Sequence, residues 1–198
     1  MFATNCYLVA CPVTKEAIII DPGAEGRRIA GKIKELGLKA KYIINTHGHI
    51  DHIGANGTLK EEFQIPILIH ENDSALYHKP GYGLGLVLHK QPKPDRFIRE
   101  GDSICFGEQS LAVLETPGHT KGGISLLTGM AIFTGDTLFA GSIGRTDLPG
   151  GFFAEIISSI CKKIMVLPPQ TIVYPGHGPS STVANEAVAN PYIAGNVS

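Results

Sequence analysis

The segment HGHIDH at residues 47–52 places three histidines and one aspartate within six positions, and only Asn45 and Thr46 separate it from the short apolar run YII at 42–44. Four such side chains cannot converge from a straight strand, because alternate residues of a strand point to opposite faces. They can converge where a strand gives way to a helix, with the first two histidines at the strand end and Asp51 and His52 at the helix start. The segment therefore predicts a strand-to-helix turn lined by imidazole and carboxylate groups.

Three further glycine-flanked turns each carry one more side chain of the same kind. They follow strands expected at 110–115, 131–134 and 171–174, and their polar residues are His119, Asp136 and His177. Imidazole and carboxylate without thiolate suit Zn, Fe or Mn and argue against a purely structural cysteine site. Seven such ligands are too many for one tetrahedral ion. They indicate two divalent metal ions that share a bridging carboxylate.

The histidines outside these motifs have a simpler interpretation. They are His70, His78 and His89. A lone histidine is more often a hydrogen-bonded core or surface residue than a ligand, so none of the three is included in the predicted site. The same interpretation does not suit the motif residues, because five histidines and two aspartates recur at strand ends beside glycine.

The periodicity of the remaining sequence predicts alternating strands and helices. In the first half we expect strands at 5–10 and 17–20, a helix at 25–36, a strand at 42–44, a helix at 54–62 and a strand at 67–69. In the second half we expect strands at 103–106, 110–115, 123–128 and 131–134, a helix at 152–165, a strand at 171–174 and a helix at 182–189. Residues 77–95, rich in Gly, Pro and Lys, are expected to form a surface flap. Two blocks of strands with helices after each indicate two sheets packed face to face beneath outer helices.

Composition limits the possible classes of protein. The 198 residues are 43% hydrophobic and 18% charged, which predicts one domain, 1–198, with a sizeable core. The net charge is −1 and the sequence has no basic stripe, so nucleic acid is not an expected partner. No apolar run reaches the roughly 18 residues of a membrane span, and the start lacks the basic segment of a secretory signal. We therefore expect a cytoplasmic protein with no membrane partner, whose cysteines are unbridged thiols: Cys6, Cys11, Cys105 and Cys161.

The set HxHxDH, followed by a distant His, Asp and His on glycine turns, resembles the metallo-β-lactamase superfamily over residues 5–192. The resemblance implies an α/β (α+β) fold, a four-layer αββα sandwich with the metal site at one edge between the two sheets. It also implies ligand roles by matching motifs: the first metal on His47, His49 and His119, the second on Asp51, His52 and His177, and Asp136 as the bridge.

A finer resemblance is to the glyoxalase II-like group. The segments that carry it are IDPG at 20–23, TPGHT at 116–120, GDTLF at 135–139 and GRTD at 144–147. Asp136 stands where antibiotic-hydrolysing zinc lactamases place a Cys ligand, and His49 stands where diiron oxygen reductases usually have Glu. Both branches are therefore disfavoured, as are the nuclease branches with added RNA-binding parts. Full-length glyoxalase II enzymes carry a further helical domain, so the resemblance is to the short, single-domain members.

This group implies hydrolysis of a thioester, such as S-lactoylglutathione, by a metal-bridging hydroxide that Asp51 orients. Zn²⁺ is the expected metal, with Fe or Mn as alternatives. A thiol leaves with a pKa of about 8.5, so the lack of an obvious general acid among the motif residues is consistent with this chemistry. Arg145 and Lys121 are expected to bind the anionic substrate, a small molecule, with an Arg145–Asp147 ion pair as the alternative. Tyr82 in the flap is a further candidate.

Two other functions are compatible with the ligand set. A mononuclear iron persulfide dioxygenase of the same superfamily shares the GRTD segment and uses equivalents of His47, His119 and Asp136. The compact chain favours the hydrolase over this dioxygenase. A binding protein that uses metal only for stability is disfavoured, because no motif residue is missing.

Overall fold

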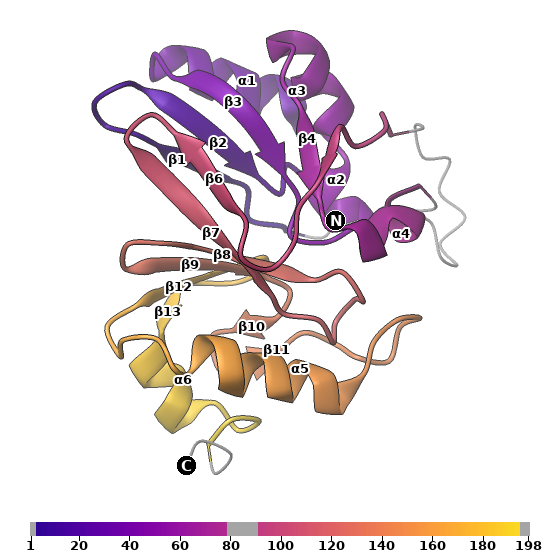
Figure 1. Ribbon diagram of the computed structural model, residues 1–198, viewed down its shortest axis with the longest axis vertical. Helices are drawn as coiled ribbons and strands as arrows, with labels where there is room; N and C mark the ends of the chain where they lie inside the picture. Colours follow the sequence, from indigo (N-terminus) through magenta and orange to yellow (C-terminus); the bar gives the residue numbers. More distant parts are fainter. Residues whose placement is uncertain (1–2, 79–90, 195–198) are drawn as a thin grey trace.

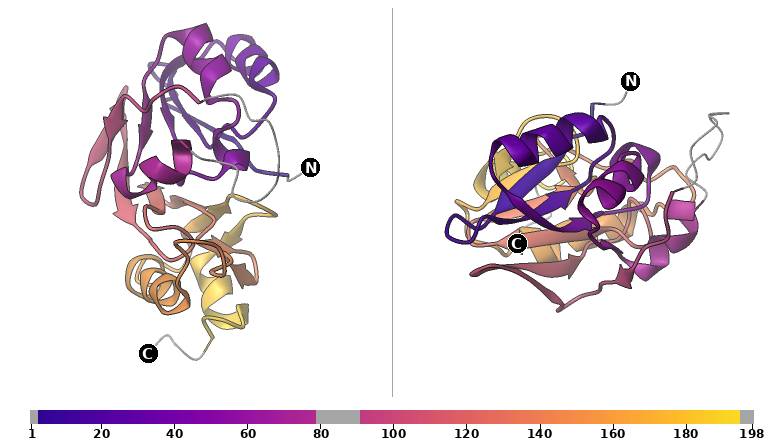
Figure 2. Two further views of the ribbon diagram at one scale, coloured as in Figure 1. Left: turned by 90° about the vertical axis from the view of Figure 1, so that its right-hand side faces the viewer. Right: turned by 90° about the horizontal axis from the view of Figure 1, so that it is seen from above.

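Four layers make up the computed structural model, which describes residues 3–78 and 91–194 (Figure 1). In the described residues, helices α1 (Gly26–Glu35) and α3 (Asn56–Phe63) cover the outer face of one sheet. Helices α5 (Phe153–Ser159) and α6 (Val183–Ala189) cover the outer face of the other, and the two sheets face each other between them (Figures 1 and 2). The predicted αββα sandwich is therefore confirmed.

The first sheet is mostly parallel. Within the described part of the chain its strands are, in spatial order, β1 (Tyr7–Ala10), β2 (Glu16–Ile20), β3 (Lys39–Ile44), β4 (Ile67–Ile69) and β5 (Arg96–Phe97). Only the β1–β2 pair is antiparallel. Parallel neighbours need a crossover, which α1 provides between β2 and β3, and α2 (Ile50–Ile53) with α3 provides between β3 and β4. Strands covered on both faces appear as unbroken apolar runs, which explains AIII in β2.

The second sheet is mostly antiparallel. Its described strands, in spatial order, are β13 (Ser181–Thr182), β12 (Ile172–Pro175), β9 (Ala131–Gly135), β8 (Ile124–Thr128), β7 (Gln109–Glu115) and β6 (Ser103–Phe106). Strand β12 pairs parallel with β9, while β9 and β7 each pair antiparallel with β8. Strands β7, β9 and β12 therefore run in the same direction, and their carboxyl ends lie at one edge of the sheet.

Alternate residues of the strands fill different layers of the core. Ile18 and Ile20 of β2 pack between the two sheets, whereas Ile19 packs against the helices of the first outer layer. In β9, Ile132 packs against the helices of the second outer layer and Phe133 between the sheets. Burying a large aliphatic side chain stabilises a fold by about 1.5–3 kcal/mol, so a register slip in either sheet would be strongly unfavourable.

Most predicted elements are confirmed, with four kinds of difference. Strand β3 begins at Lys39, because Lys39 and Ala40 pair with Glu16 and Ala17 of β2 despite their weak strand signal. The helix expected at 54–62 begins at Asn56, and α2 precedes it. The helix expected at 152–165 continues from α5 into a π-helix at Ile160–Ile164. Short strands were not predicted: β5, β10 (Leu138–Phe139), β11 (Ser142–Ile143) and β13.

The expected flap at 77–95 coincides only in part with described residues. The helix α4 (Ser74–His78), which was not predicted, extends into its start, and residues 79–90 lie outside the description, including Tyr82 and His89. Across the ranges 3–78 and 91–194, no helix has both the length and the apolar character of a membrane span.

Candidate metal centre

Seven motif side chains meet at one edge of the sandwich, between the two sheets. The loop after β3 and the helix α2 carry four of them, and the loops after β7, β9 and β12 carry one each. They are His47, His49, Asp51, His52, His119, Asp136 and His177. The structure thus brings together every metal-ligand candidate that the sequence predicts.

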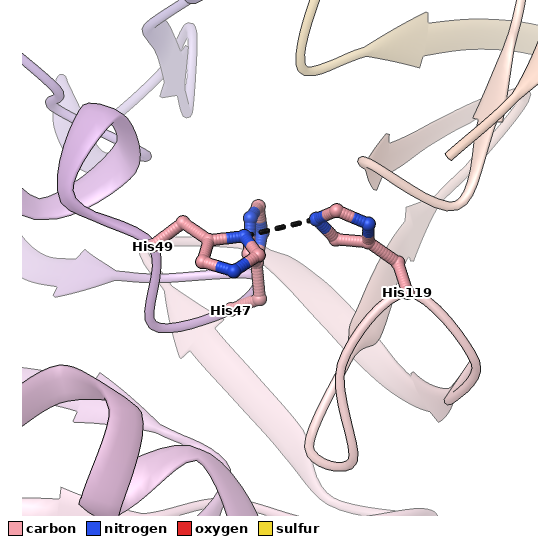
Figure 3. A group of neighbouring side chains, drawn as sticks. All are labelled: His47, His49 and His119. Carbon is pink, nitrogen blue, oxygen red and sulfur yellow. Dashed lines mark hydrogen bonds between the residues drawn. The ribbon is translucent and has the colours of Figure 1, made fainter. Parts of the chain in front are cut away.

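Three histidines from both sheets form one cluster, here called the tri-histidine group: His47, His49 and His119 (Figure 3). One ring nitrogen of each lies within 4.8 Å of the others. His49 Nδ1 and His119 Nε2 face each other across 2.9 Å. His47 is almost fully buried, and its ring lies edge-on to the other two rings.

Asp51, His52 and His177 form the second cluster, here called the mixed group. His177 Nε2 lies 3.2 Å from Asp51 Oδ2 and 3.3 Å from His52 Nε2. This group is nearer to solvent, with side-chain exposures of 22% for Asp51 and 29% for His177.

Asp136 lies between the two groups. Its Oδ1 is 3.3 Å from His52 Nε2, and its Oδ2 is 3.5 Å from His177 Nε2. The same Oδ2 is 3.6 Å from His119 Nε2 and 4.0 Å from His47 Nε2. One carboxylate therefore faces both groups, as a bridging ligand must.

Outer hydrogen bonds fix which nitrogen of each ring points inward. Thr46 Oγ1 donates its one hydrogen to Asp21, so the 3.1 Å contact with His47 Nδ1 leaves the histidine as the donor. The Nδ1 atoms of the other three such rings face Asp21 Oδ2 at 2.9 Å (His52), Arg145 O at 2.7 Å (His119) and Ala3 O at 3.0 Å (His177). All four rings thereby direct Nε2 inward, and such partners orient metal-ligating histidines in general. His49 differs, since its Nδ1 faces the centre.

In the tri-histidine group the surroundings of His47 and His49 favour neutral imidazole rings. Burial and the neighbouring His52 lower the pKa of His47 well below its usual value. Burial and the adjacent His119 lower the pKa of His49 to about 4. Both imidazoles are therefore uncharged at neutral pH, which is the state that coordinates a metal.

In the mixed group neighbouring carboxylates raise the pKa of the histidines. Hydrogen bonds to Asp136 and Asp51 raise the pKa of His177 to about 10. Burial opposes a charge on His52, but Asp136 and Asp21 outweigh it and raise the pKa of His52 well above the usual value. Burial likewise opposes the charge on Asp136, yet His52 and His177 hold its pKa well below the usual range. The two aspartates of the centre are therefore ionised at neutral pH.

Two buried polar atoms indicate what this arrangement can hold. Among the described residues, His47 Nε2 and Asp136 Oδ1 have no hydrogen-bond partner. A buried polar atom without a partner costs about 1–3 kcal/mol, and a cation between them would satisfy both. Five imidazoles and two carboxylates form a donor set suited to divalent Zn, Fe or Mn. The residues fit a divalent metal, while coordination by each of the seven stays a prediction.

Asp21 is a residue of this site that the sequence analysis missed. It is 2% exposed, accepts hydrogen bonds from Thr46 N at 2.7 Å and Thr46 Oγ1 at 2.6 Å, and lies beside His52 Nδ1. A signal for it existed, because Asp21 directly follows β2, whose carboxyl end lies beside that of β3 in a parallel pair. Its segment had served only as a mark of family resemblance.

The structure gives less support to the predicted substrate-binding residues than to the metal ligands. The Arg145 guanidinium donates to both carboxylate oxygens of Asp147, at 2.8 and 2.7 Å, so the expected alternative, an ion pair, is present. Lys121 is exposed beside Gly150. Tyr82 lies outside the described residues.

The residues expected to stay outside the site do so where they are described. His70 is hydrogen-bonded to Glu115 at 3.0 Å, and His78 is exposed at the end of α4. The chain between residues 3 and 78 and between 91 and 194 contains no disulfide.

Comparison with known proteins gives a consistent result. The family model described as the Metallo-beta-lactamase superfamily matches residues 1–177. The chain is 38% identical over 199 residues to the hydroxyacylglutathione hydrolase GloC of Haemophilus influenzae, covering 97% of this chain and 93% of that protein.

Solved structures are similar over nearly the whole chain. The B3 metallo-beta-lactamase BLEG-1 is 35% identical with a TM-score of 0.89, covering 96% of this chain and 94% of that one. TTHA1623 in a di-iron-bound form is 37% identical with a TM-score of 0.88, covering 96% of each chain. ETHE1 from Myxococcus xanthus is 33% identical with a TM-score of 0.82, covering 98% of this chain and 83% of that one.

Proposed function

The chain belongs to the metallo-β-lactamase superfamily and is a metal-dependent hydrolase, and on this premise we propose that it cleaves thioesters of the glyoxalase II type, such as S-lactoylglutathione. The observation that carries the proposal is the position of Asp136, within 3.3–4.0 Å of histidines from both ligand groups. The similarity to a hydroxyacylglutathione hydrolase supports the substrate class.

We propose one divalent cation at each ligand group, with Asp136 shared between them. Zn²⁺ is the first candidate, and the di-iron form of a protein 37% identical supports iron as an alternative. When bound, such a pair of cations activates water and polarises a carbonyl. The chain's own residues then have to hold, orient and shield the substrate.

Asp51 is proposed to orient the attacking water. Hydrogen bonding from His177 and the nearby His52 outweigh burial and lower the pKa of Asp51, so it is a carboxylate at neutral pH. Thr4 Oγ1 donates to Asp51 Oδ2 at 3.2 Å and holds that oxygen in place. An ionised carboxylate accepts a hydrogen bond and does not donate one, so Asp51 suits water orientation and not protonation of the leaving group.

The leaving group follows from the same charges. Asp51 and Asp136 are both ionised, so neither holds a proton for a departing group before the reaction begins. A thiol has a pKa of about 8.5 and leaves readily as the thiolate. A thioester substrate, whose thiolate departs without a proton, is therefore compatible with the ionised carboxylates.

Arg145 and Lys121 are proposed to bind the remote carboxylate of the substrate, with Tyr82 as a further contact. The Arg145–Asp147 pair is solvent-exposed, at 60% and 68% of the side chains. Exposed pairs contribute only about 0–1 kcal/mol, so a substrate carboxylate can replace Asp147 as the partner. The proposed partner is a small anionic thioester, with no nucleic acid and no membrane.

A persulfide dioxygenase is the second candidate. His47, His119 and Asp136 approach one another as a two-histidine, one-carboxylate set, with Asp136 Oδ2 3.6 Å from His119 and 4.0 Å from His47. The 33% identity to ETHE1 supports this candidate too. A single iron on that set leaves the mixed group without a role, so the hydrolase is favoured.

The deciding experiment is metal analysis of protein purified without chelators, combined with two turnover assays. One follows thiol release from S-lactoylglutathione, and the other follows oxygen uptake on glutathione persulfide. We expect two metals per chain, saturable thiol release and no oxygen uptake. One iron per chain with oxygen uptake and no thiol release would replace the hydrolase by the dioxygenase.

A further inference from the structure

A buried carboxylate outside the metal centre joins two of the loops that carry it. Asp73 ends the short 3-10 helix Glu71–Asp73 and is 1% exposed. Its Oδ2 accepts a hydrogen bond from Gly48 N at 2.9 Å, and its Oδ1 accepts one from Gly122 N at 2.7 Å. The two oxygens of one side chain thus hold two separate stretches of backbone.

These two stretches belong to different sheets. Gly48 stands between His47 and His49 in the loop after β3 of the first sheet, and Gly122 follows His119 in the loop after β7 of the second. The tri-histidine group is complete only when these loops have a fixed relative position. Asp73 is a direct link between them that passes through neither a ligand side chain nor a metal.

The two glycines are fitted closely to Asp73. A Cβ on Gly122 would lie 2.6 Å from Asp73 N and 2.8 Å from Asp73 Oδ1. A Cβ on Gly48 would lie 3.0 Å from Asp73 O and 2.9 Å from Tyr77 N. A side chain at Gly122 would collide with the Asp73 carboxylate, and one at Gly48 would crowd the backbone of Asp73 and Tyr77, so glycine suits both positions.

We propose that Asp73 is a positioning residue of the metal centre, which sets the distance of His47 and His49 from His119. Two backbone N–H groups donate to the two oxygens of this one side chain, so the side chain holds both loops at a fixed separation. Asp73 contacts neither substrate nor reacting atoms and acts only through the two ligand loops.

The inference rests on the metal centre of the proposed function and not on its substrate. Cobalt binding therefore tests it without a turnover assay, and failure of the thioester assay would leave this test intact. Co²⁺ serves as the probe because its visible absorption reports the number and geometry of its ligands.

The main variant is Asp73→Asn, which keeps the shape of the side chain but places an NH₂ against one of the two backbone N–H donors. In a titration of metal-free protein with CoCl₂, we expect Co²⁺ affinity at the tri-histidine group to fall roughly ten- to a hundredfold, as for other outer partners of metal ligands. The visible spectrum of that site should change, while binding at the mixed group stays near wild type. In the thioester assay, kcat should fall with little change in KM.

Asp95→Asn is the matched control. Asp95 accepts a hydrogen bond from Ile67 N at 2.8 Å and pairs with Lys60, so the control also removes a carboxylate that holds backbone. It directly precedes β5, and its contacts are to the start of β4 and to α3 and not to the ligand loops. We expect a lower Tm with wild-type cobalt affinity and spectrum.

Gly122→Ala disturbs the same hydrogen bond at its donor. We expect it to weaken cobalt binding as Asp73→Asn does, and the double variant to lose little more than the worse single variant, because both break one link. Wild-type cobalt binding in Asp73→Asn, with a Tm loss like that of Asp95→Asn, would overturn the proposal. Additive losses in the double variant would also overturn it.

Discussion

The tri-histidine group and the mixed group use the same imidazole chemistry under opposite conditions. His47 and His119 have side chains that are 2% and 6% exposed; in the mixed group His52 is equally buried, whereas His177 is 29% exposed. The pKa of His49 is lowered to about 4 and that of His177 is raised to about 10. Neighbours therefore decide the charge state: the first group is surrounded by apolar burial and other imidazoles, the second by carboxylates.

The two groups also depend on different parts of the chain. Asp73 links the loops of the tri-histidine group. The mixed group is held by residues 3–5, through Ala3 O on His177, Thr4 Oγ1 on Asp51 and Asn5 N on Gly176 O at 2.7 Å. We therefore expect the two cations to differ in their dependence on pH and in the substitutions that release them.

The largest expected effect is the loss of activity when one ligand, His119, or the bridging ligand, Asp136, is removed. His119→Ala should disable the tri-histidine group alone, and Asp136→Ala should weaken both, because its carboxylate faces histidines of each. Both variants should lose more than about a thousandfold in kcat/KM on S-lactoylglutathione, about 4 kcal/mol of transition-state stabilisation.

Metal analysis of the two variants then sharpens the comparison. His119→Ala should keep about one metal per chain, whereas Asp136→Ala should keep less. Circular dichroism should remain that of a folded protein, although the loss of bound metal will lower the Tm. Either variant with more than about a tenth of wild-type activity would contradict the ligand assignment.

The next effect is the pH dependence of metal binding. The raised pKa values keep a proton on His177 and on His52, and a cation must displace both, so affinity at the mixed group should rise with pH. Each displaced proton contributes about tenfold per pH unit, so affinity should rise at least about a hundredfold from pH 6.5 to 8.5. The tri-histidine group, with a pKa of about 4 at His49, should show a nearly constant affinity over that range.

Calorimetric titrations with Zn²⁺ in two buffers of different ionisation enthalpy measure the protons released in each step. We expect proton release mainly in the weaker step. Two steps with equal proton release would mean that the groups do not differ as their surroundings indicate.

A smaller effect is expected at Arg145, whose backbone and side chain have different roles. The backbone oxygen accepts from His119 Nδ1 at 2.7 Å, while the guanidinium pairs with Asp147. Arg145→Ala keeps the backbone contact, so metal content should not change. KM for a glutathione thioester should rise roughly tenfold, or up to a hundredfold, because a charge-assisted contact contributes about 1.5–3 kcal/mol.

Asp147→Asn is the matched control, because it frees the guanidinium without removing it and should leave KM unchanged or lower. A small neutral thioester should be far less sensitive to Arg145→Ala. Equal losses on both substrates would show that the side chain holds the loop and does not bind the substrate.

The smallest expected effect is at Thr4. Thr4→Val removes the hydroxyl that donates to Asp51 at 3.2 Å and preserves the shape of the side chain. One hydrogen bond contributes about 1 kcal/mol, so metal affinity at the mixed group should fall roughly fivefold in a Zn²⁺ titration. A similar loss of Zn²⁺ affinity at the tri-histidine group would show that residues 3–5 do not act on the mixed group alone.

The ligands could be predicted from sequence because each stands in a short motif at a strand end. HGHIDH at 47–52 and the glycine turns at His119, Asp136 and His177 are local patterns that need no knowledge of the fold. The two sheets were predictable from two blocks of strands with helices after each, and the four layers followed from the family resemblance.

The supports of the ligands could not be predicted in the same way. Asp21 lies 31 positions from His52 along the chain, and Asp73 lies 49 positions from Gly122, so no local pattern connects them. Strand β13 was missed because its two residues pair only after β12 is in place. Contacts of this kind depend on which strand ends become neighbours, and that follows from the assembled sheets.

The parallel pairing of β12 with β9 has a consequence for when the protein becomes active during folding. Strand β12 delivers His177, and its register with β9 joins Ile172 to Ala131 and Val173 to Ile132, about 40 residues apart in sequence. Contacts between distant segments form slowly, because the intervening loop must close before any pairing is gained. A chain still being synthesised can already contain six of the seven ligands and yet lack a complete mixed group. The onset of hydrolysis in a refolding reaction should therefore mark the docking of β12 and follow the earlier appearance of secondary structure.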